Sequence, residues 1–450
     1  MNLVYGIHDR PKFIQLLIFA FQQVLAILAA TITVPAIVGN NMSAAAALFG
    51  AGVGTIVYQL FTKFRSPVFL GSSFAFIGPM LAAFAGGVSM SLGYAGLIIG
   101  AVFAGLVYVV IAIVVKFAGV KWIDKVMPAA VIGPTVALIG LSLAGAAISD
   151  VFSYGAKTTF GVSSYFIMET NIWVSLICAM VTLFTVILVS TYGKKMLKLI
   201  PFIIGILAGY AVAAIFTVIG EATGNNALKV IDFSVFSNVN IFAVPEFTFL
   251  EALKGTKEIN GGYVATIAAA YVPVAFVVFA EHLADHKNLS SIIGQDLITE
   301  PGLHRTLLGD GVGSMFGAFF GGCPNTTYGE SVGCVAITRN ASIITITTAA
   351  IMCIIISFFD PFVAFLDSIP GCVMGGVCIT LYGFIAVSGL KMVQKVDLNQ
   401  NRNLFTVAAI LIPGIGGMAL GINGIYITNI ACALILGILT NVALSKAKSE

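Results

Sequence analysis

Residues 278–287 read VFAEHLADHK and end a long apolar run that begins near residue 262. The run has no charged residue as far as Ala280, and two carboxylates and two histidines then follow. Glu281 and Asp285 are four residues apart, so on a helix they share one face. In hydrocarbon an ionisable side chain is costly and normally faces the protein interior or a wet cavity. We therefore expect Glu281 to be a functional residue of a membrane-embedded helix.

The alternative is that the helix simply ends at this point. The charges would then lie in the headgroup region, an explanation that suits His286 and Lys287 better than Glu281, because Glu281 directly follows the apolar run.

The composition indicates a polytopic membrane protein. Of 450 residues, 59% are hydrophobic and 9% are charged, whereas a soluble domain has about 25% charged residues. The chain has no basic block that would indicate a nucleic-acid partner. The first apolar segment lacks the pattern of a cleaved signal peptide. The seven cysteines lie in or beside apolar stretches without metal-ligand spacing, so we expect neither a metal nor a cofactor.

Apolar runs separated by charged breaks predict an all-α protein with fourteen transmembrane segments, at about 20 residues per span. The expected spans are 13–37, 44–62, 68–88, 93–117, 127–148, 171–191, 199–219, 262–283, 306–320, 323–338, 341–359, 371–389, 403–420 and 424–444.

Lysine and arginine alternate between the loops in a way that predicts the orientation. The cations on one side are Lys63, Arg65, Lys116, Lys121, Lys125, Lys194, Lys195, Lys198, Lys287, Arg305, Arg339, Lys391, Lys395, Arg402, Lys446 and Lys448. The loops on the other side have few, apart from Lys157 and the segment 221–261. By the positive-inside rule both termini are expected in the cytoplasm.

Two expected spans are interrupted at corresponding places of the two halves. The third begins SPVFLGSSFAFIGP (66–79), and the tenth begins near GGCPNTTYGE (321–330). Irregular backbone at membrane depth is tolerated only where it is buried or lines a cavity, and paired interrupted segments indicate the binding site of a transporter. Fourteen spans therefore split as seven plus seven in an inverted repeat. The alternative reading is a pair of ordinary kinked helices.

Several motifs resemble the nucleobase–ascorbate transporter family, and among its members the bacterial uracil permeases. They are LGSSFAF (70–76), AEH (280–282), PGLHR (301–305), PNTTYGE (324–330) and AITR (336–339), and the likeness extends from about residue 8 to 445.

The resemblance implies an elevator-type symporter of the bacterial cytoplasmic membrane that forms a homodimer. Short strands in spans 3 and 10 would cross at mid-membrane. A core domain would comprise residues 1–125 and 262–360, and a gate domain with the dimer contact would comprise 126–261 and 361–450. The implied substrate-binding residues are Glu281, Glu330, Ser73, Phe74, Tyr328, Gly329 and Tyr382. Glu281 and Glu330 would bind through their carboxylates, and Phe74 and Gly329 through their backbone amides.

Three positions depart from the uracil permeases. Asp285 stands where they have a histidine, Ser331 replaces an asparagine, and Gln23 replaces a histidine of the first span. Aspartate at the place of Asp285 is common in purine and xanthine transporters of the family. The departures therefore affect the proton-coupling details and the choice of substrate more than the fold.

The residues suit a nucleobase. Uracil is a flat, neutral ring with N–H donors and C=O acceptors, so its site needs acceptors, donors and an apolar slot. Two carboxylates supply acceptors, and two strand-to-helix turns supply N–H donors at helix N-termini. Phe74, Phe76 or Tyr328 could line the ring face, although core packing explains Phe76 equally well.

The same carboxylates suit proton coupling. Glu281, with Asp285 one turn away and Glu330 beside the ligand, would exchange the coupling proton, with sodium as the alternative ion. Asp285 could instead pair with His286 or Lys287, and Glu330 could be only a helix cap. His282 is expected to pack or to donate a hydrogen bond rather than to bind the ligand.

The leading function is therefore proton-coupled import of a nucleobase, most simply uracil, with xanthine or another purine as the closest alternative. An anion transporter on the same inverted fold would favour a cationic or neutral site, whereas Glu281 and Glu330 are anionic. An intramembrane enzyme using the two carboxylates as acid and base would form product without any gradient. We expect a transporter rather than an enzyme. The chain has no glycine-rich phosphate loop, no metal-spaced His/Cys set and no nucleophile triad, so direct use of ATP is not expected.

Overall fold

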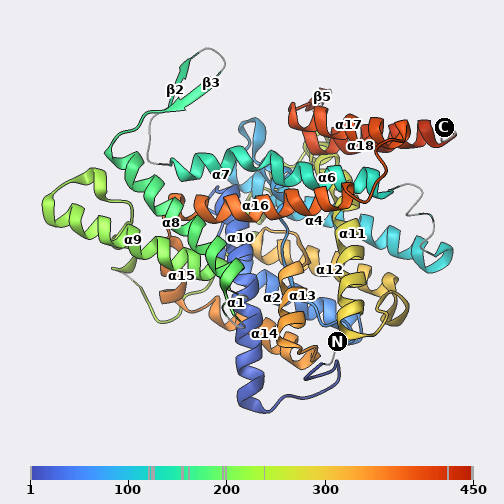
Figure 1. Cartoon of the computed structure of the whole chain (residues 1–450), viewed down its shortest axis with the longest axis horizontal. Helices are drawn as coiled ribbons and strands as arrows, with labels where there is room; N and C mark the ends of the chain where they lie inside the picture. Colours follow the sequence, from blue (N-terminus) through green and yellow to red (C-terminus); the bar gives the residue numbers. More distant parts are fainter. Residues whose placement is uncertain are drawn as a thin grey trace. The chain divides into compact units, whose positions relative to one another are not determined.

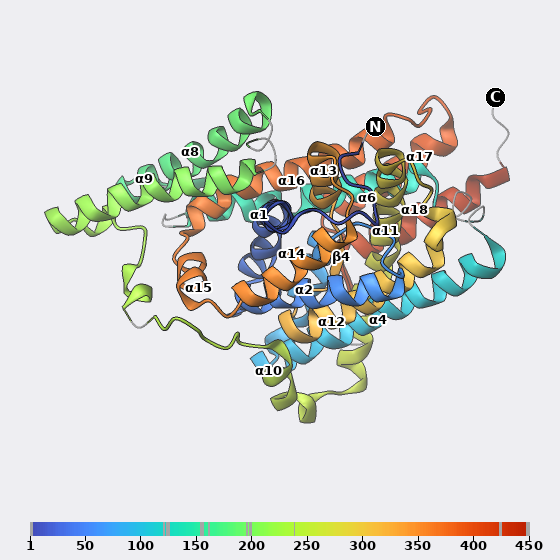
Figure 2. The ribbon, with the colours of Figure 1, turned by 90° about the horizontal axis from the view of Figure 1, so that it is seen from below.

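The computed structural model describes residues 3–119, 122, 127–153, 157–160, 163–194, 197, 200–237, 239–422 and 425–446. Figures 1 and 2 show the chain in two views. By its internal contacts it divides into two compact units. The larger unit comprises Met1–Ser142, Val244–Phe358 and Ile385–Glu450, and the smaller unit comprises Leu143–Ala243 and Phe359–Phe384. These units arise from spatial contacts, and the expected division into core and gate domains stays a prediction.

The larger unit is mainly helical. Its helices are α1 (Phe13–Val38), α2 (Ala44–Phe61), α3 (Ile77–Ala83), α4 (Met90–Ala118), α6 (Ala129–Ser142), α10 (Thr248–Lys254), α11 (Gly261–Ile293), α12 (Leu303–Gly321), α13 (Gly329–Thr338), α14 (Ile343–Ile356), α17 (Asn401–Ile415) and α18 (Asn429–Ala443). Its strands are β1 (Leu70–Ser72), β4 (Asn325–Thr327), β5 (Leu420–Ile422) and β6 (Ile425–Ile427).

The smaller unit is built around the helix pair α8 (Thr170–Tyr192) and α9 (Pro201–Thr223), which pack side by side (Figure 1). It also contains α7 (Ala144–Val151), α15 (Asp360–Asp367) and the antiparallel strands β2 (Lys157–Phe160) and β3 (Ser163–Phe166). Helix α16 (Gly371–Val393) begins in the smaller unit and ends in the larger one.

Side chains with short polar groups start the long helices. Ser43, Ser89 and Asn260 accept hydrogen bonds from the first-turn N–H groups of α2, α4 and α11. These N–H groups have no acceptor within the helix, so the caps fix where each helix begins.

Helix α12 lies between α2 and α4 (Figure 2). A Cβ added at Gly50 of α2 would lie 2.5 Å from the carbonyl oxygen of Gly317 in α12. One added at Gly313 would lie 2.7 Å from the carbonyl oxygen of Gly54. The helices therefore approach backbone to backbone, as small residues permit in membrane proteins.

The two interrupted segments contain short strands that pair with each other. β1 and β4 are antiparallel, with Leu70 opposite Thr327, Gly71 opposite Thr326 and Ser72 opposite Asn325. All six residues are buried. β1 leads through a 3-10 turn at Phe74–Phe76 into α3, and β4 leads into α13.

Eight helices in the described part of the chain are long and apolar enough to cross a membrane. They are Phe13–Val38, Ala44–Phe61, Met90–Ala118, Ala129–Val151, Thr170–Tyr192, Pro201–Thr223, Gly261–Ile293 and Gly371–Val393. Each coincides with an expected span, so the prediction of a mainly helical, multi-pass protein is confirmed at this level. The other six segments contain shorter or less apolar helices, and the count of fourteen stays a prediction.

The structure leaves the orientation of the termini untested. Five of the cations used to predict it, namely Lys121, Lys125, Lys195, Lys198 and Lys448, lie outside the described residues.

We predict that Gly50→Ala destabilises the protein by about 1–3 kcal/mol, the usual cost of overpacking a tight contact. The neighbouring atom is a backbone oxygen, which cannot move without shifting α12. The measurement is the midpoint of thermal unfolding in detergent. Gly145→Ala in α7 is the matched control, because its Cβ would meet open space; equal midpoints for both variants would contradict the prediction.

Candidate functional site

Helix α11 presents two different faces at its polar turn. Glu281 is exposed and Asp285 is half-buried, and both lie on one face. His282 and His286 are buried, with 0% and 1% of their surface exposed. The carboxylates therefore border accessible space, whereas the histidines face the protein core.

Strand β4 and helix α13 contact α11 (Figure 2). The Thr327 hydroxyl donates a hydrogen bond of 3.0 Å to Asp285 Oδ2. A Cβ on Gly329, the first residue of α13, would lie 3.8 Å from Asp285 Oδ1. Glu330 follows in the first turn of α13 and is an electrostatic neighbour of Glu281. Three carboxylates from two helices thus meet at the end of one strand.

The contacts of the polar turn bear on two alternatives: pairing of Asp285 with His286 or Lys287, and a headgroup position for the charges. Asp285 hydrogen-bonds to Thr327, and no ion pair joins it to His286 or Lys287 among the described residues. Lys287 is exposed, but His286 is buried, so the headgroup explanation is wrong for His286.

Ser73 and Phe74 lie at the end of β1. Ser73 is buried, and its N–H donates to the carbonyl oxygen of Pro324 at 2.9 Å, which continues the strand pairing. Phe74 is half-buried and begins the 3-10 turn. The end of β1 is thereby tied to the start of β4.

Tyr328 has a structural role in addition to any role in binding. Its hydroxyl donates to the carbonyl oxygen of Ser72 at 2.7 Å, and its N–H donates to that of Phe69 at 3.1 Å. A Cβ on Gly71 would lie 2.4 Å from the Tyr328 ring, so only glycine fits beneath it. Phe76 is buried and stacks on Tyr271 with ring centroids 5.5 Å apart, which favours core packing over ligand contact.

Tyr382 belongs to the smaller unit, in α16, where it is 2% exposed. The other expected site residues belong to the larger unit. That Tyr382 lies near them stays a prediction.

Two of the three departures from the uracil permeases touch each other. The Ser331 hydroxyl accepts a hydrogen bond of 3.0 Å from the N–H of Phe69, just before β1. Gln23 of α1 donates through Nε2 to the carbonyl oxygen of Ser331 at 3.5 Å. Ser331 and Gln23 therefore join α1, β1 and α13, a contact between distant residues that the sequence did not reveal.

Asp310 is not among the site residues expected from the sequence. This residue is 1% exposed in α12, and its Oδ2 lies 2.7 Å from Nδ1 of His282. A signal was present, because Asp310 is the single acidic residue in the expected span 306–320 and an ionisable residue in a span is a functional hypothesis by default. Asp310 is an electrostatic neighbour of both Glu281 and Asp285.

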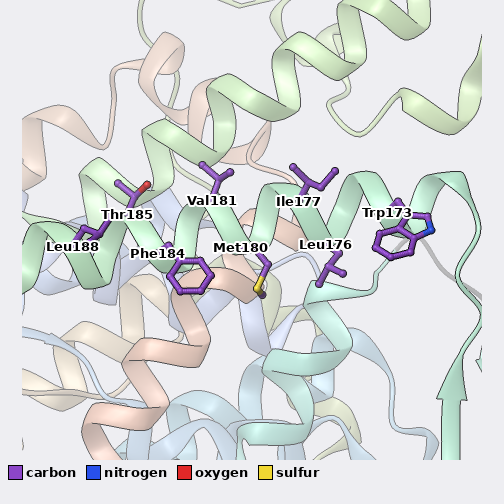
Figure 3. A pocket seen from close by; sticks show the side chains of 8 residues that line it. All are labelled: Trp173, Leu176, Ile177, Met180, Val181, Phe184, Thr185 and Leu188. Carbon is purple, nitrogen blue, oxygen red and sulfur yellow. The ribbon is translucent and has the colours of Figure 1, made fainter.

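The apolar pocket in Figure 3 does not suit a polar ligand. It is lined by Trp173, Leu176, Ile177, Met180, Val181, Phe184, Thr185 and Leu188 of α8. These side chains recur every three or four residues along one face of the helix, and Trp173 and Phe184 are more than half exposed. The face offers one hydroxyl and no charge, as expected for a lipid-facing surface.

No cluster of three or more metal-ligating side chains occurs in the described part of the chain. The seven cysteines are all buried and free.

We predict that Ser331→Ala lowers the free energy of unfolding by about 1–3 kcal/mol, because the Phe69 N–H would lose its acceptor in a buried place. Thr347→Val is the matched control, since the half-buried Thr347 hydroxyl donates to the Ile343 carbonyl within its own helix, α14. Thermal unfolding in detergent provides the comparison, and a Ser331→Ala midpoint no lower than that of the control would refute the role of this bond.

The fold is similar to that of known transporters. The transmembrane domain of the cyanobacterial bicarbonate transporter BicA matches with a TM-score of 0.63 at 16% identity, covering 97% of this chain and 100% of that one. SLC26A9 matches with a TM-score of 0.64 at 12% identity, covering 96% of this chain and 65% of that one. At these identities the likeness concerns the fold alone.

Curated relatives match at higher identity. The chain is 36% identical to the uracil permease of Bacillus subtilis (strain 168), over 99% of this chain and 96% of that protein. It is 38% identical to the uracil permease of Bacillus caldolyticus, over 98% and 94%. It is 33% identical to the uracil permease of Escherichia coli (strain K12), over 96% and 92%. Residues 14–422 match the Permease family, Xan_ur_permease. The protein therefore belongs to this family and is a multi-pass membrane transporter rather than an enzyme.

Proposed function

We propose that this protein is a secondary active importer of a nucleobase, with uracil as the first candidate, driven by proton symport. The observation that carries the proposal is the meeting of α11, β4 and α13. Glu281, Asp285 and Glu330 come together there, beside the N-terminus of α13.

The chemistry of this meeting point matches a nucleobase edge. In the proposed complex Glu281 and Glu330 accept hydrogen bonds from the ring N–H groups, and the backbone N–H groups of Phe74 and Gly329 donate to its carbonyl oxygens. Ser73, Tyr328 and Tyr382 complete the proposed site. Leaving one buried partner unpaired costs about 1–3 kcal/mol, which supports discrimination between bases with different edges.

The names of the relatives support the choice of uracil, since three of them are uracil permeases. Asp285 supports the alternative of xanthine or another purine, because the uracil-type histidine is missing there. An anion transporter is the second alternative, suggested by the SLC26A9 and BicA folds. The accessible carboxylate of Glu281 disfavours it, since an anion would be repelled.

The proposed architecture follows the inverted repeat. Fourteen spans form two halves of seven, and each half contributes one short strand and the helix after it. The core domain is 1–125 with 262–360, and the gate domain is 126–261 with 361–450. The core moves across the membrane in an elevator-type cycle, and two protomers associate through the gate. Both termini face the cytoplasm in a bacterial plasma membrane.

Proton coupling is proposed to act through the carboxylates of Glu281, Asp285 and Glu330. Several negative charges at one place cannot all persist at low cost, so binding of a proton accompanies binding of the neutral base. Sodium is the alternative coupling ion.

Labelled uracil should accumulate in proteoliposomes under an imposed inward proton gradient. A protonophore should abolish the accumulation, and unlabelled uracil should compete better than xanthine. Competition by xanthine alone would transfer the proposal to a purine. Accumulation that follows a sodium gradient and ignores the proton gradient would contradict proton symport.

Glu281→Gln should weaken uracil binding by about tenfold to a hundredfold, because a hydrogen bond to a charged group contributes about 1.5–3 kcal/mol. Binding measured by calorimetry in detergent checks this. Glu258→Gln, at an exposed position outside the site, serves as the control and should bind like the unmodified protein. Unchanged affinity in Glu281→Gln would remove this carboxylate from the site.

A further inference from the structure

Asp310 is a carboxylate that the proposed binding site does not use. It lies in the middle of α12, and glycines stand on both sides of it at Gly309 and Gly311. These glycines let α2 and α4 approach closely: a Cβ on Gly309 would lie 3.0 Å from the Tyr58 ring, and one on Gly311 would lie 2.8 Å from Cβ of Tyr108. Burial of a carboxylate in such a place is costly unless a partner compensates its charge.

His282 is that partner. Its Nδ1 lies 2.7 Å from Asp310 Oδ2, and its Nε2 lies 3.0 Å from the hydroxyl oxygen of Thr306. Thr306 and Asp310 are four residues apart on α12 and so lie on one face. The imidazole ring is therefore held at both nitrogens by two side chains of the same helix.

The Thr306 hydroxyl has a second partner, the carbonyl oxygen of Leu303 at 3.0 Å. A hydroxyl has one hydrogen to donate and can also accept. When His282 carries no proton on Nε2, Thr306 can donate to Nε2. When His282 does carry a proton there, Nε2–H donates to Thr306, and Thr306 can turn its hydrogen to Leu303.

The pair can thus bind or release one proton while the nitrogens of His282 and the Thr306 hydroxyl stay hydrogen-bonded. In the empty form Nδ1–H donates to the Asp310 carboxylate, and the pair has a charge of −1. In the loaded form one more proton is bound, either as imidazolium with carboxylate or as neutral imidazole with carboxylic acid, and the pair is neutral. Unpaired buried groups are costly, so an arrangement that pairs these groups in both forms favours reversible binding.

The neighbouring histidine is arranged differently. Nδ1 of His286 lies 2.9 Å from the carbonyl oxygen of His282, to which it must donate. Its Nε2 lies 2.7 Å from the Tyr58 hydroxyl and 3.3 Å from that of Ser66, and either can donate to it. Among the described residues no carboxylate bonds to His286. The two rings stack with centroids 4.0 Å apart, so a charge on one opposes a charge on the other, and His282 is the ring with the compensating carboxylate.

Titratable groups that interact with Asp310 lie on α2, α4 and α11, and α13 adds Glu330 next to Glu281. Glu281 and Asp285 lie on α11, Glu330 on α13, Tyr58 on α2 and Tyr108 on α4. Three of these groups, Glu281, Asp285 and Glu330, are carboxylic acids. No lysine or arginine forms an ion pair with Asp310 in the described part of the chain. A negative surrounding favours the loaded form of the pair over the empty form.

A small cavity adjoins Asp310. The space that the centre of a water molecule can occupy in it is about 10 Å³, and its lining includes Tyr108, Ser314 and Asn325. The Oδ1 atoms of Asp310 and Asn325 are both buried, and no hydrogen-bond donor of the described residues reaches either. A space of this size with polar atoms on its wall suits one water molecule, which could pass a proton to Asp310 from the side of β4.

We infer that the His282–Asp310 pair is a proton-binding site in addition to Glu281, and that the proton bound there crosses the membrane with the substrate. This inference rests on the proposed function, because it names a residue pair that carries a proton of the symport.

The test uses the full chain in proteoliposomes and compares Asp310→Asn with the unmodified protein. Asparagine keeps the size of the side chain and can accept from Nδ1–H, but it cannot take part in storing a proton with His282. Three quantities are measured: exchange of labelled for unlabelled uracil without a gradient, accumulation under an inward proton gradient, and protons moved per uracil, read with a pH-sensitive dye.

In Asp310→Asn we expect exchange to continue and the number of protons per uracil to fall by one. The loss of one proton lowers the limiting accumulation ratio by about tenfold for each pH unit of the imposed gradient, since a tenfold ratio corresponds to about 1.4 kcal/mol. Asp310→Glu should recover part of the coupling. Asp296→Asn, an exposed carboxylate outside the transmembrane helices, is the control and should keep the full stoichiometry.

A second variant covers the case in which Asp310→Asn does not fold. Thr306→Val removes the hydroxyl that accepts from Nε2–H in the loaded form. Bonds from a charged donor are about twice as strong as neutral ones, so the loaded form loses more than the empty form. Half-maximal uptake should therefore move to a lower pH, and Thr306→Ser should restore it.

The outcomes separate the two proposals. An Asp310→Asn protein that moves as many protons per uracil as the unmodified protein overturns the inference and leaves the proposed function intact. An unchanged pH profile in Thr306→Val also counts against it. If the unmodified protein exchanges no nucleobase at all, the proposed function fails and the inference fails with it.

Discussion

The pairing of β1 with β4 is the contact on which the larger unit depends. Two strands of three residues, about 250 residues apart in the chain, bring the two interrupted segments to one place. The pairing continues at both ends through Ser73 with Pro324 and Tyr328 with Phe69. Because each strand leads directly into a helical turn, the pairing also sets where the first turns of α13 and of Phe74–Phe76 begin.

The helices around this pairing meet through glycine rather than through large apolar side chains. The Asn325 side chain donates to the carbonyl oxygen of Gly50 at 3.0 Å, and a Cβ at Gly54 or Gly317 would lie within 2.5 Å of its atoms. One amide thus links β4 to α2 and fits against α12. Apolar surface drives little helix association in a bilayer, because lipid is as apolar as the side chains. Close backbone contacts and buried hydrogen bonds therefore hold these helices together.

The charged residues of the site are divided between two environments. Glu281 and Asp285 lie toward accessible space, and Asp310 is matched to His282 in the core. Successive residues of α11 thereby lie in two different environments, since neighbouring positions on a helix point about 100° apart. A core cluster that includes Tyr58, Leu70, Leu289, Val332 and Ile343 holds α2, β1, α11, α13 and α14 together next to these charges.

The sequence by itself determined the membrane class and the places of the long helices, and it indicated Glu281 as a candidate site residue. Those conclusions depend on local properties: runs of apolar residues, caps, and a charge placed against the apolar run. The three-dimensional structure decided which distant residues meet. The bonds of Asp285 to Thr327, of Ser331 to Phe69 and of His282 to Asp310 join residues 28 to 262 positions apart, and no periodicity or spacing encodes such contacts. They arise only when the antiparallel strands and the close glycine crossings bring the helices together, so the partner of each buried polar group became visible only in the folded chain.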